Sequence, residues 1–356
     1  MTESPADGEI VARVEGSVGR LGLNRPRALG ALTTAMVEAM TAALLAWRAD
    51  TGVEMVLIDH VGDRGFCAGG DIRFLSQSAA QGGAGAREFF FKEYQLNHLL
   101  MAFPKPVMTV MDGVTMGGGV GLSLPCRWRI ATERTRFAMP ETGIGLFPDV
   151  GGGWHLPRLP GRAGLWLALT GARLSGADCL RLGVATHLID AERLDALKAE
   201  CLAAPSSIDD ILVGFSTTPT TAPIEASLAL IDRLYSGHSV ETILRDLEAD
   251  GGEFARRELE TLRTKSPLSM KTAFRQLAGG AVAPSFAAEM AVEMRIGARI
   301  VMSHDFTEGV RAVIIDKDNA PRWSPAAPSQ VSDAMLDAIF APLPADQEWS
   351  PLSELT

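Results

Sequence analysis

The chain has 356 residues, of which 47% are hydrophobic and 21% are charged, and its formal net charge is −10. Such a composition is typical of a soluble globular protein, and the length is enough for one large domain or two modest ones. The negative charge argues against a general nucleic-acid-binding protein and against binding to an anionic membrane. It still allows a local basic patch for a phosphorylated ligand.

The four cysteines lack the close spacing of a zinc site or a disulfide framework, which indicates a reducing compartment. The histidines form no close metal-ligand pair, so no metal site is predicted. The polar, acidic N-terminal stretch lacks the pattern of a secretion signal, and no apolar run is long enough to cross a membrane. From these observations we predict a cytoplasmic protein.

Strand and helix patterns alternate in the first half of the chain. Predicted strands cover 10–14, 18–23, 53–59 and 107–111. Predicted helices cover 33–49, with Thr33 as its cap, and 88–101. Strand, crossover helix and strand in succession imply parallel pairing with right-handed connections. The small, glycine-rich stretch 76–87 is predicted to be a mobile loop.

The second half of the chain is predicted to be mostly helical. Helices are expected at 162–169, from the cap Ser175 to Gly183, and from the cap Asp190 to about 203, with a strand at 184–189. Further signals are a cap at Ser266 and a segment, 305–308, that resembles a capping box. We predict an α/β domain at 1–204, a linker at 205–222, a helical region at 223–322 and a proline-rich tail at 323–356. The tail is expected to be weakly structured, apart from a possible helix at 331–340.

Two glycine turns follow predicted strands and lead into predicted helices. Gly117, Gly118 and Gly119 precede a short helix at 120–124, and residues 65–71 form the second turn. Glycine allows a ligand to approach the backbone closely, and amides at a helix start carry partial positive charge. Two such turns can aim one amide each at a single oxygen that becomes negative during a reaction.

Two carboxylates, Glu141 and Asp149, lie in a loop that is otherwise poor in charge. The segment between them is mostly apolar, and apolar surroundings raise the pKa of a carboxylate and fit it for acid, base or nucleophilic work. Other chemistries lack their motifs. The third glycine of a dinucleotide-binding GxGxxG pattern falls on Leu122, and Pro125 replaces the last glycine of a GxSxG elbow.

Long motifs resemble those of a known family. They are FCAGGDI at 66–72, MDGVTMGGGVGLSL at 111–124, AMPETGIGLFPDVGGGWHLPRL at 138–159 and HDFTEGVRAVIIDKDNAPRW at 304–323. Together they resemble the enoyl-CoA hydratase/isomerase (crotonase) superfamily, along nearly the whole chain. The joint presence of Glu141 and Asp149 is most similar to the 3-hydroxyisobutyryl-CoA hydrolase branch. This resemblance implies an α/β fold with a crotonase-type ββα superhelix, a spiral core, and a C-terminal helical region.

The resemblance also implies an activity, the hydrolysis of a 3-hydroxyacyl-CoA thioester in valine degradation. The oxyanion would be bound by the backbone amides of Gly70 and Gly118. Glu141 would act as general base or as nucleophile through a transient anhydride, and Asp149 would orient water or bind the 3-hydroxyl group. Hydratases of the superfamily use a second glutamate just after the glycine triplet, where this chain has Gly121.

Other substrate contacts come from the same resemblance. Glu93, Ala68 and Asp71 are expected at the acyl-CoA, and Arg25 and Lys271 are candidates for the coenzyme A moiety. Coenzyme A is then part of the substrate, so no separate cofactor is expected, nor a nucleic-acid or membrane partner. A monomer or small homo-oligomer is expected. The alternatives are an enoyl-CoA hydratase or isomerase, which needs a second acid, and an acyl-CoA-binding protein without catalysis.

Overall fold

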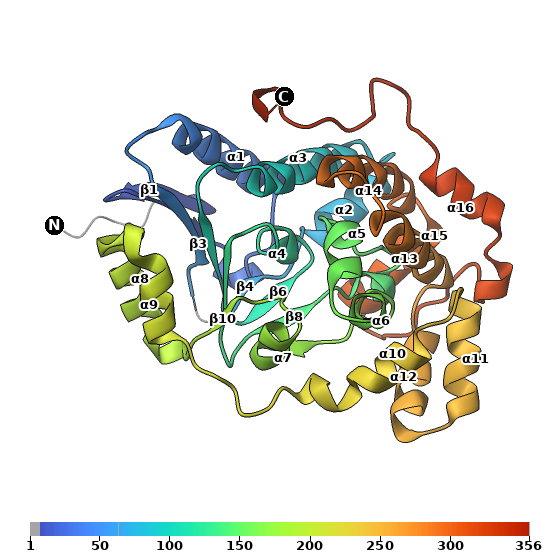
Figure 1. The fold of residues 1–356 in the computed structure, drawn as a ribbon. Helices are drawn as coiled ribbons and strands as arrows, with labels where there is room; N and C mark the ends of the chain where they lie inside the picture. Colours follow the sequence, from blue (N-terminus) through green and yellow to red (C-terminus); the bar gives the residue numbers. More distant parts are fainter. Residues whose placement is uncertain (1–7, 63, 356) are drawn as a thin grey trace. The chain divides into compact units, whose positions relative to one another are not determined.

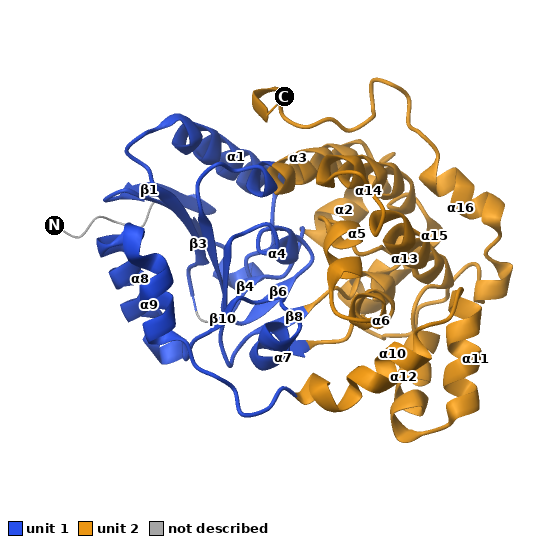
Figure 2. Ribbon diagram, in the orientation of Figure 1, with its two compact units in different colours: residues 1–70, 99–137, 174–222 blue, residues 71–98, 138–173, 223–356 orange. Residues whose placement is uncertain are grey.

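Figure 1 shows the computed structural model, which describes residues 8–62 and 64–355. The chain divides into two compact units, each built from segments that are far apart in the sequence (Figure 2). Unit 1 consists of residues 1–70, 99–137 and 174–222, and unit 2 consists of residues 71–98, 138–173 and 223–356. Domain limits drawn along the sequence therefore stay a prediction.

Unit 1 contains a six-stranded sheet in the order β1-β2-β3-β5-β7-β10. Its strands are β1 (Ile10–Glu15), β2 (Val18–Leu23), β3 (Met55–His60), β5 (Val107–Met111), β7 (Trp128–Ala131) and β10 (His187–Leu188). β1 and β2 form an antiparallel hairpin, and all later neighbours pair in parallel. The four strands predicted in the first half of the chain are confirmed, and so is the parallel pairing of those joined by crossover helices, β2 with β3 and β3 with β5. β10 is shorter than the strand predicted at 184–189.

A second sheet holds four short strands in the order β4-β6-β8-β9. They are β4 (Gly65–Cys67), β6 (Val114–Met116), β8 (Arg136–Ala138) and β9 (Leu174–Ser175). β4 and β6 pair in parallel, whereas β8 and β9 pair antiparallel. β4 and β6 each lead into one of the two glycine turns. No sequence pattern predicted these strands, because two or three residues are too few to display an alternation of apolar and polar positions.

The helical elements of unit 1 lie on both faces of the six-stranded sheet (Figure 1). They are η1 (Pro26–Ala28), α1 (Thr34–Ala49), α4 (Gly118–Gly121), α7 (Gly176–Arg181), η4 (Ala191–Arg193), α8 (Leu194–Ala203), η5 (Pro205–Ser207) and α9 (Ile208–Phe215). The Thr33 side chain caps α1 as predicted, since it accepts a hydrogen bond from the Met36 amide. Trp47 of α1 lies flat against β2 at Gly19, where an added Cβ would lie 2.5 Å from the ring.

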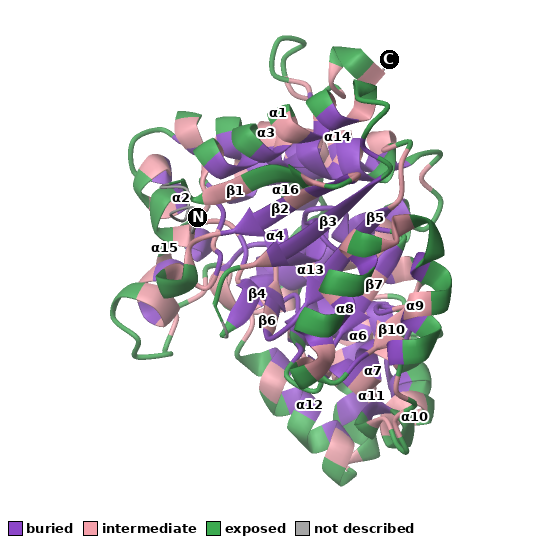
Figure 3. Ribbon diagram, turned by 90° about the vertical axis from the view of Figure 1, so that its left-hand side faces the viewer, coloured by how far each residue is buried: buried purple, intermediate pink, exposed green. Residues whose placement is uncertain are grey.

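The other face of this sheet is covered by α8 and α9. Alternate residues of the strands, such as Leu57, Val110 and Ile130, form one buried cluster with Ile208 and Leu212 of α9. Figure 3 shows the inner strands β3 and β5 buried and the outward faces of α8 and α9 exposed. The predicted linker at 205–222 thus contains a packed helix in its first half, and its Thr/Pro-rich part, 216–222, lies outside any helix.

Unit 2 is helical. Its elements are α2 (Ile72–Ala79), α3 (Ala84–Met101, of which residues 84–98 belong here), η2 (Glu141–Ile144), α5 (Gly152–His155), η3 (Leu156–Arg158), α6 (Ala163–Thr170), η6 (Pro223–Ser227), α10 (Leu228–Leu234), α11 (Val240–Asp250), α12 (Glu253–Arg263), α13 (Pro267–Gly280), α14 (Phe286–Ile300), α15 (His304–Val310), a π-helical turn (Arg311–Ile315), η8 (Pro328–Gln330), α16 (Asp333–Phe340) and η9 (Ser353–Leu355). Among the described helices, none combines the length and apolar character that a membrane span requires.

Two local predictions in this unit are wrong. The stretch 76–87 is not a loop, because α2 runs to Ala79, α3 begins at Ala84, and the turn between them needs only four residues. Alanine favours a helix and serine opposes one only weakly. A stretch of small and polar residues is therefore not by itself evidence for a loop. The capping box at 305–308 is also absent, since Ser303 caps α15 and Asp305 accepts the Ser266 hydroxyl instead.

The tail after Trp323 is more ordered than predicted. Its expected helix is present as α16. Arg299 of α14 donates hydrogen bonds to the carbonyls of Ile339, Ala341 and Pro342 around the end of that helix. Farther along, Trp349 is buried and donates to the carbonyl of Phe91 on α3. Contacts with distant helices therefore hold a segment whose own sequence has little tendency to fold.

The packing of α9 yields a test on the free energy of unfolding. We expect Leu212→Ala to lower it by about 2–5 kcal/mol, because the substitution leaves a cavity in a closed apolar cluster. Val213, the next residue of the same helix, is 75% exposed. Val213→Ala should change the value by less than about 0.5 kcal/mol. Chemical denaturation of both variants measures this, and equal stabilities would show that α9 does not pack as described.

Candidate active site

The downstream glycine turn connects β6 to α4 in unit 1. Gly117 precedes the helix with a φ of 47°, a backbone conformation that favours glycine. Gly118 is the first residue of α4, so its amide has no acceptor within its own helix. An amide in that position is available to a ligand oxygen, as the sequence predicts for Gly118.

The upstream glycine turn follows β4 and is fixed on both sides of Gly70. The Ala68 amide donates to the Leu29 carbonyl at 2.9 Å, and the Leu32 amide donates to the Gly69 carbonyl at 2.8 Å. An added Cβ on Gly69 would lie 3.6 Å from the Gly118 nitrogen. The two turns are therefore in direct contact within unit 1, which is the arrangement that a pair of amides on one oxygen requires.

The predicted acids are brought together in unit 2. Glu141 is the first residue of η2, Asp149 precedes α5, and Glu93 lies on α3; all three are buried. The Tyr94 hydroxyl donates to Oδ2 of Asp149 at 2.9 Å. Oε2 of Glu141 and Oε1 of Glu93 are buried without a hydrogen-bond partner among the described residues. Unpartnered buried oxygens are costly unless water or a ligand satisfies them, so a hydrogen-bond donor is expected beside each of these two oxygens.

Burial sets the protonation of these acids. It raises the pKa of Asp149 to about 7, and the hydrogen bond from Tyr94 limits that rise. The pKa of Glu141 is raised well above its ordinary value, chiefly by burial and then by the charge of Asp149. The pKa of Glu93 is also raised well above its ordinary value, again by burial and then by the charge of Asp149. Carboxyl groups whose pKa values approach neutrality can exchange protons with a substrate at physiological pH.

Several polar residues of this neighbourhood were missed by sequence reasoning. Glu293 of α14 accepts the amides of Gly151 and Gly153, and Gln276 of α13 donates to Glu293 and to the Pro148 carbonyl. Glu293 and Gln276 are themselves buried. The available signal was polar residues recurring one helical turn apart, Glu289 and Glu293, on a helix that is otherwise largely apolar.

The other predicted substrate contacts have roles in the fold. Asp71 caps α2 through the Phe74 amide, and Ala68 uses its amide in the upstream turn. Arg25 donates to the Ala31 carbonyl and pairs with Glu9. Lys271 donates to Glu241 and to the carbonyls of Val331 and Pro328. The contacts to the acyl-CoA substrate stay predictions.

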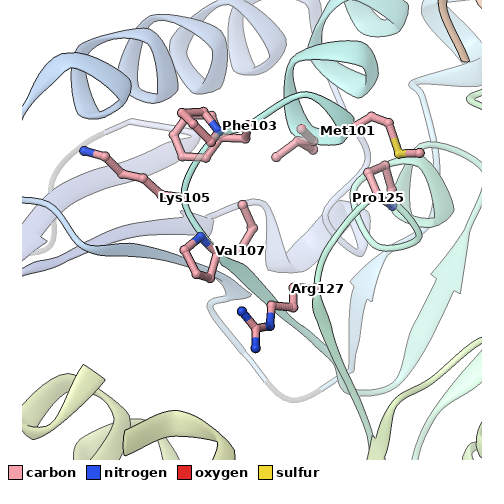
Figure 4. Close-up of a pocket in the computed structure, with 9 residues that line it drawn as sticks. Met101, Phe103, Lys105, Val107, Pro125 and Arg127 are labelled. Carbon is pink, nitrogen blue, oxygen red and sulfur yellow. The ribbon is translucent and has the colours of Figure 1, made fainter. Parts of the chain in front are cut away.

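One pocket of unit 1 lies at the chain segment that leads into β5 (Figure 4). Its volume is about 290 Å³, and its lining includes Met101, Phe103, Lys105, Pro125 and Arg127. None of the predicted catalytic, oxyanion-binding or substrate-binding residues lines this pocket. Lys105 also donates to the carbonyls of Trp47 and Asp50, which holds the end of α1. The pocket is therefore not the predicted active site.

Comparison with known proteins identifies the family of this chain. A family model described as enoyl-CoA hydratase/isomerase matches residues 18–340. The chain belongs to this family. Curated relatives include the mitochondrial 3-hydroxyisobutyryl-CoA hydrolases of Danio rerio, 43% identical, and Homo sapiens, 40% identical. The first alignment covers 96% of this chain and 92% of the relative, and the second covers 94% and 89%.

Solved structures confirm the predicted crotonase-type fold. A protein described as a carnitinyl-CoA dehydratase from Mycobacterium thermoresistibile matches with a TM-score of 0.92 at 38% identity, over 97% of this chain and 99% of that one. One described as an enoyl-CoA hydratase from Rhodobacter sphaeroides matches with a TM-score of 0.89, also at 38% identity, over 96% of this chain and 100% of that one. The similarity extends through the C-terminal helices as well as the sheets.

The comparisons also correct one prediction. The expected cytoplasmic location is wrong, because the curated relatives are named as mitochondrial proteins, which points to the mitochondrion. The prediction relied on the dispersed cysteines, on the lack of a secretion-signal pattern and on the lack of a long apolar run, and all four cysteines are indeed free. Free cysteines indicate a reducing environment, but they do not distinguish one reducing compartment from another.

The contact between the two glycine turns can be tested by thermal unfolding. An added Cβ on Gly119 would lie 2.5 Å from the Cys67 carbonyl oxygen, so Gly119→Ala must push the turns apart. We expect it to destabilise the protein by about 1–3 kcal/mol, as overpacking does. Gly279→Ala is the control, because no described atom lies within 4 Å of its added Cβ. It should be neutral or stabilise α13 by up to about 1 kcal/mol. Equal losses in both variants would contradict the contact.

Proposed function

We propose that this chain hydrolyses the thioester of 3-hydroxyisobutyryl-CoA and releases 3-hydroxyisobutyrate and coenzyme A, a step of valine degradation. The proposal is carried by the buried pair of Glu141 and Asp149 in a chain that is 40–43% identical, over nearly its whole length, to relatives named for this reaction. Coenzyme A enters as part of the substrate, and the reaction needs no separate cofactor.

The first step is attack of water on the thioester carbonyl. Glu141 in its ionised form takes a proton from the water as the carbon–oxygen bond forms; alternatively its carboxylate attacks first and water then hydrolyses the anhydride. The carbonyl oxygen becomes an oxyanion, which the amides of Gly70 and Gly118 stabilise. Losing one such donor typically raises the barrier by about 3 kcal/mol.

The second step is departure of the thiol. In the general-base route the oxyanion collapses, the carbon–sulfur bond breaks, and the sulfur of coenzyme A receives the proton that Glu141 took from water. In the anhydride route the sulfur leaves before water attacks and takes its proton from the protonated form of Asp149, which the hydrolytic water later restores. Asp149 either orients the attacking water or binds the 3-hydroxyl group and assists this proton transfer. With a pKa near 7, Asp149 is present in both protonation states at neutral pH, which suits either role. Glu93 is proposed to contact the substrate, for which its unpartnered Oε1 is suited.

We propose further that the protein acts as a monomer or small homo-oligomer on a soluble acyl-CoA, without a nucleic-acid or membrane partner. The hydrolase branch that this chain resembles has a longer helical C-terminal region than hexameric superfamily members. That difference favours a smaller assembly.

A second candidate is an enoyl-CoA hydratase or dehydratase activity, which the names of the two structural relatives at 38% identity favour. That chemistry uses two glutamates, and this chain has Gly121 in the buried helix α4 at the first of the two positions. Glycine offers no acid. Crotonyl-CoA, followed through its enoyl absorbance, distinguishes the candidates, since fast turnover there would favour the hydratase.

Release of free thiol from 3-hydroxyisobutyryl-CoA tests the proposed function. The wild-type enzyme should release coenzyme A, whereas Glu141→Gln should lower kcat about 10²–10⁴-fold, as for loss of a general base. KM should change little, because the amides of Gly70 and Gly118 remain.

Because the raised pKa of Glu141 delays its ionisation as the pH rises, kcat/KM should climb with pH well above 4.5. Background thiol release by the wild-type enzyme would refute the function.

The role of Asp149 can be tested with paired substrates. If it binds the 3-hydroxyl group, Asp149→Asn should reduce kcat/KM more for 3-hydroxyacyl esters than for analogues without that hydroxyl. A site built to bond a hydroxyl discriminates strongly against substrates that lack it. Equal relative losses on the two esters would leave water orientation as the role of Asp149.

A further inference from the structure

The backbone immediately after Asp149 is strained. Val150 is buried and has a φ of 52°, in the left-handed region that β-branched residues almost never adopt. Gly151 follows with a φ of 91°. A residue held in such a conformation costs about 1–3 kcal/mol and persists only where its surroundings enforce it. The turn that carries Asp149 must therefore be held by other parts of unit 2.

Two helices of unit 2 hold this turn. On α14, Oε2 of Glu293 accepts the Gly151 amide at 2.9 Å, and Oε1 accepts the Gly153 amide at 3.0 Å. On α13, Gln276 donates to Oε1 of Glu293 at 3.1 Å and to the Pro148 carbonyl at 2.8 Å. The bonded backbone groups lie on both sides of Asp149 and Val150. The strained backbone therefore lies between groups that hydrogen bonds hold in place.

The carboxylate of Asp149 is fixed from a third helix. Tyr94 of α3 donates its hydroxyl to Oδ2 at 2.9 Å. Tyr94 in turn lies against α14, since an added Cβ on Gly297 would lie 3.3 Å from its hydroxyl oxygen. Tyr94 directs the side chain of Asp149, while the bonds at residues 148, 151 and 153 direct its backbone. A shift of the turn would move the backbone of Asp149 and weaken the hydrogen bond between its carboxylate and Tyr94.

We infer that Glu293 is a positioning residue of the hydrolytic reaction: by binding the amides of Gly151 and Gly153 it holds the strained turn that aims the Asp149 carboxylate. Gln276 supports Glu293 in this role. The inference rests on the proposed function and deepens it. Glu293 does not touch the reacting atoms; it acts through Asp149.

A carboxylate is the side chain that these contacts require. Three N–H donors converge on the two oxygens of Glu293, and a carboxylate accepts at both. A glutamine would place an NH₂ group against a backbone N–H at one of them. Burial, followed by the charge of Glu289, raises the pKa of Glu293, and the bonds from Gly151 and Gly153 oppose that rise. The same bonds that hold the turn therefore favour the ionised form of Glu293.

The kinetic test compares Glu293→Gln with Glu258→Gln. Both carboxyl groups are buried in unit 2, but Glu258 of α12 accepts the indole N–H of Trp166 and, among the described residues, no amide of the turn. Glu293→Gln should lower kcat about 10²-fold with KM nearly unchanged, since small misplacement of a reacting group has effects of this size. Glu258→Gln should stay within about threefold of wild type. Equal effects of the two substitutions would overturn the inference.

A double-mutant cycle shows whether Glu293 acts through Asp149. Once Asp149→Asn has removed the carboxylate, Glu293→Gln should cause little further loss of kcat, because residues that act as one unit are not additive. Losses that multiply in the double variant would contradict the inference.

Val150→Gly should partly restore kcat to Glu293→Gln, since glycine adopts the turn conformation without being held. Absence of any rescue would also count against it.

Amide hydrogen exchange provides a readout that does not depend on activity. The amides of Gly151 and Gly153 should exchange at least about tenfold faster in Glu293→Gln and remain protected in Glu258→Gln. If the wild-type enzyme releases no thiol, the proposed function fails, and unchanged protection would separately overturn the positioning role. Should Glu293→Gln not fold, Gln276→Leu removes two of the bonds and should lower kcat about tenfold. An unchanged kcat in folded Gln276→Leu would likewise refute the role.

Discussion

Removal of carboxylates from water is the constraint on which the helical unit depends. Desolvation is the largest cause of the raised pKa of Glu93, Glu141, Asp149 and Glu293. A buried charge without partners would destabilise the fold, so the protein surrounds some of these oxygens with N–H and O–H donors. The Tyr94 hydroxyl donates to Asp149, and the amides of Gly151 and Gly153 donate to Glu293. The oxygens left without donors, on Glu93 and Glu141, are those assigned to substrate or water.

The sequence could name candidate acids for the site but not the contacts that support them. Glu141, Asp149 and Glu93 could be named because long motifs identify a family, and the structure buries all three together in unit 2. Tyr94 and Glu293 could not be named in this way. Their importance lies in hydrogen bonds to residues 55 and 142 positions away in the chain. A single sequence contains no information about which distant residues meet.

The errors in the fold have a similar cause. Strands bounded by turn residues, such as β2, and helices with a good cap, such as α1, were predicted within a residue or two. The helix α9 and the tail were underestimated because composition was taken as a measure of order. Ile208 and Leu212 are helical because the sheet of unit 1 offers them an apolar surface. Tertiary contact decides such segments, and local propensity is a weak guide to them.

The bond between Trp349 and the Phe91 carbonyl has a consequence for biosynthesis. The two residues are 258 positions apart, and Phe91 lies on the helix that carries Glu93 and Tyr94. At ordinary translation rates, roughly 13–50 seconds separate their synthesis. During that interval α3 has emerged without its final partner. Every new molecule therefore passes through a period in which the helix that carries Glu93 and Tyr94 is incompletely covered and open to chaperones or to aggregation.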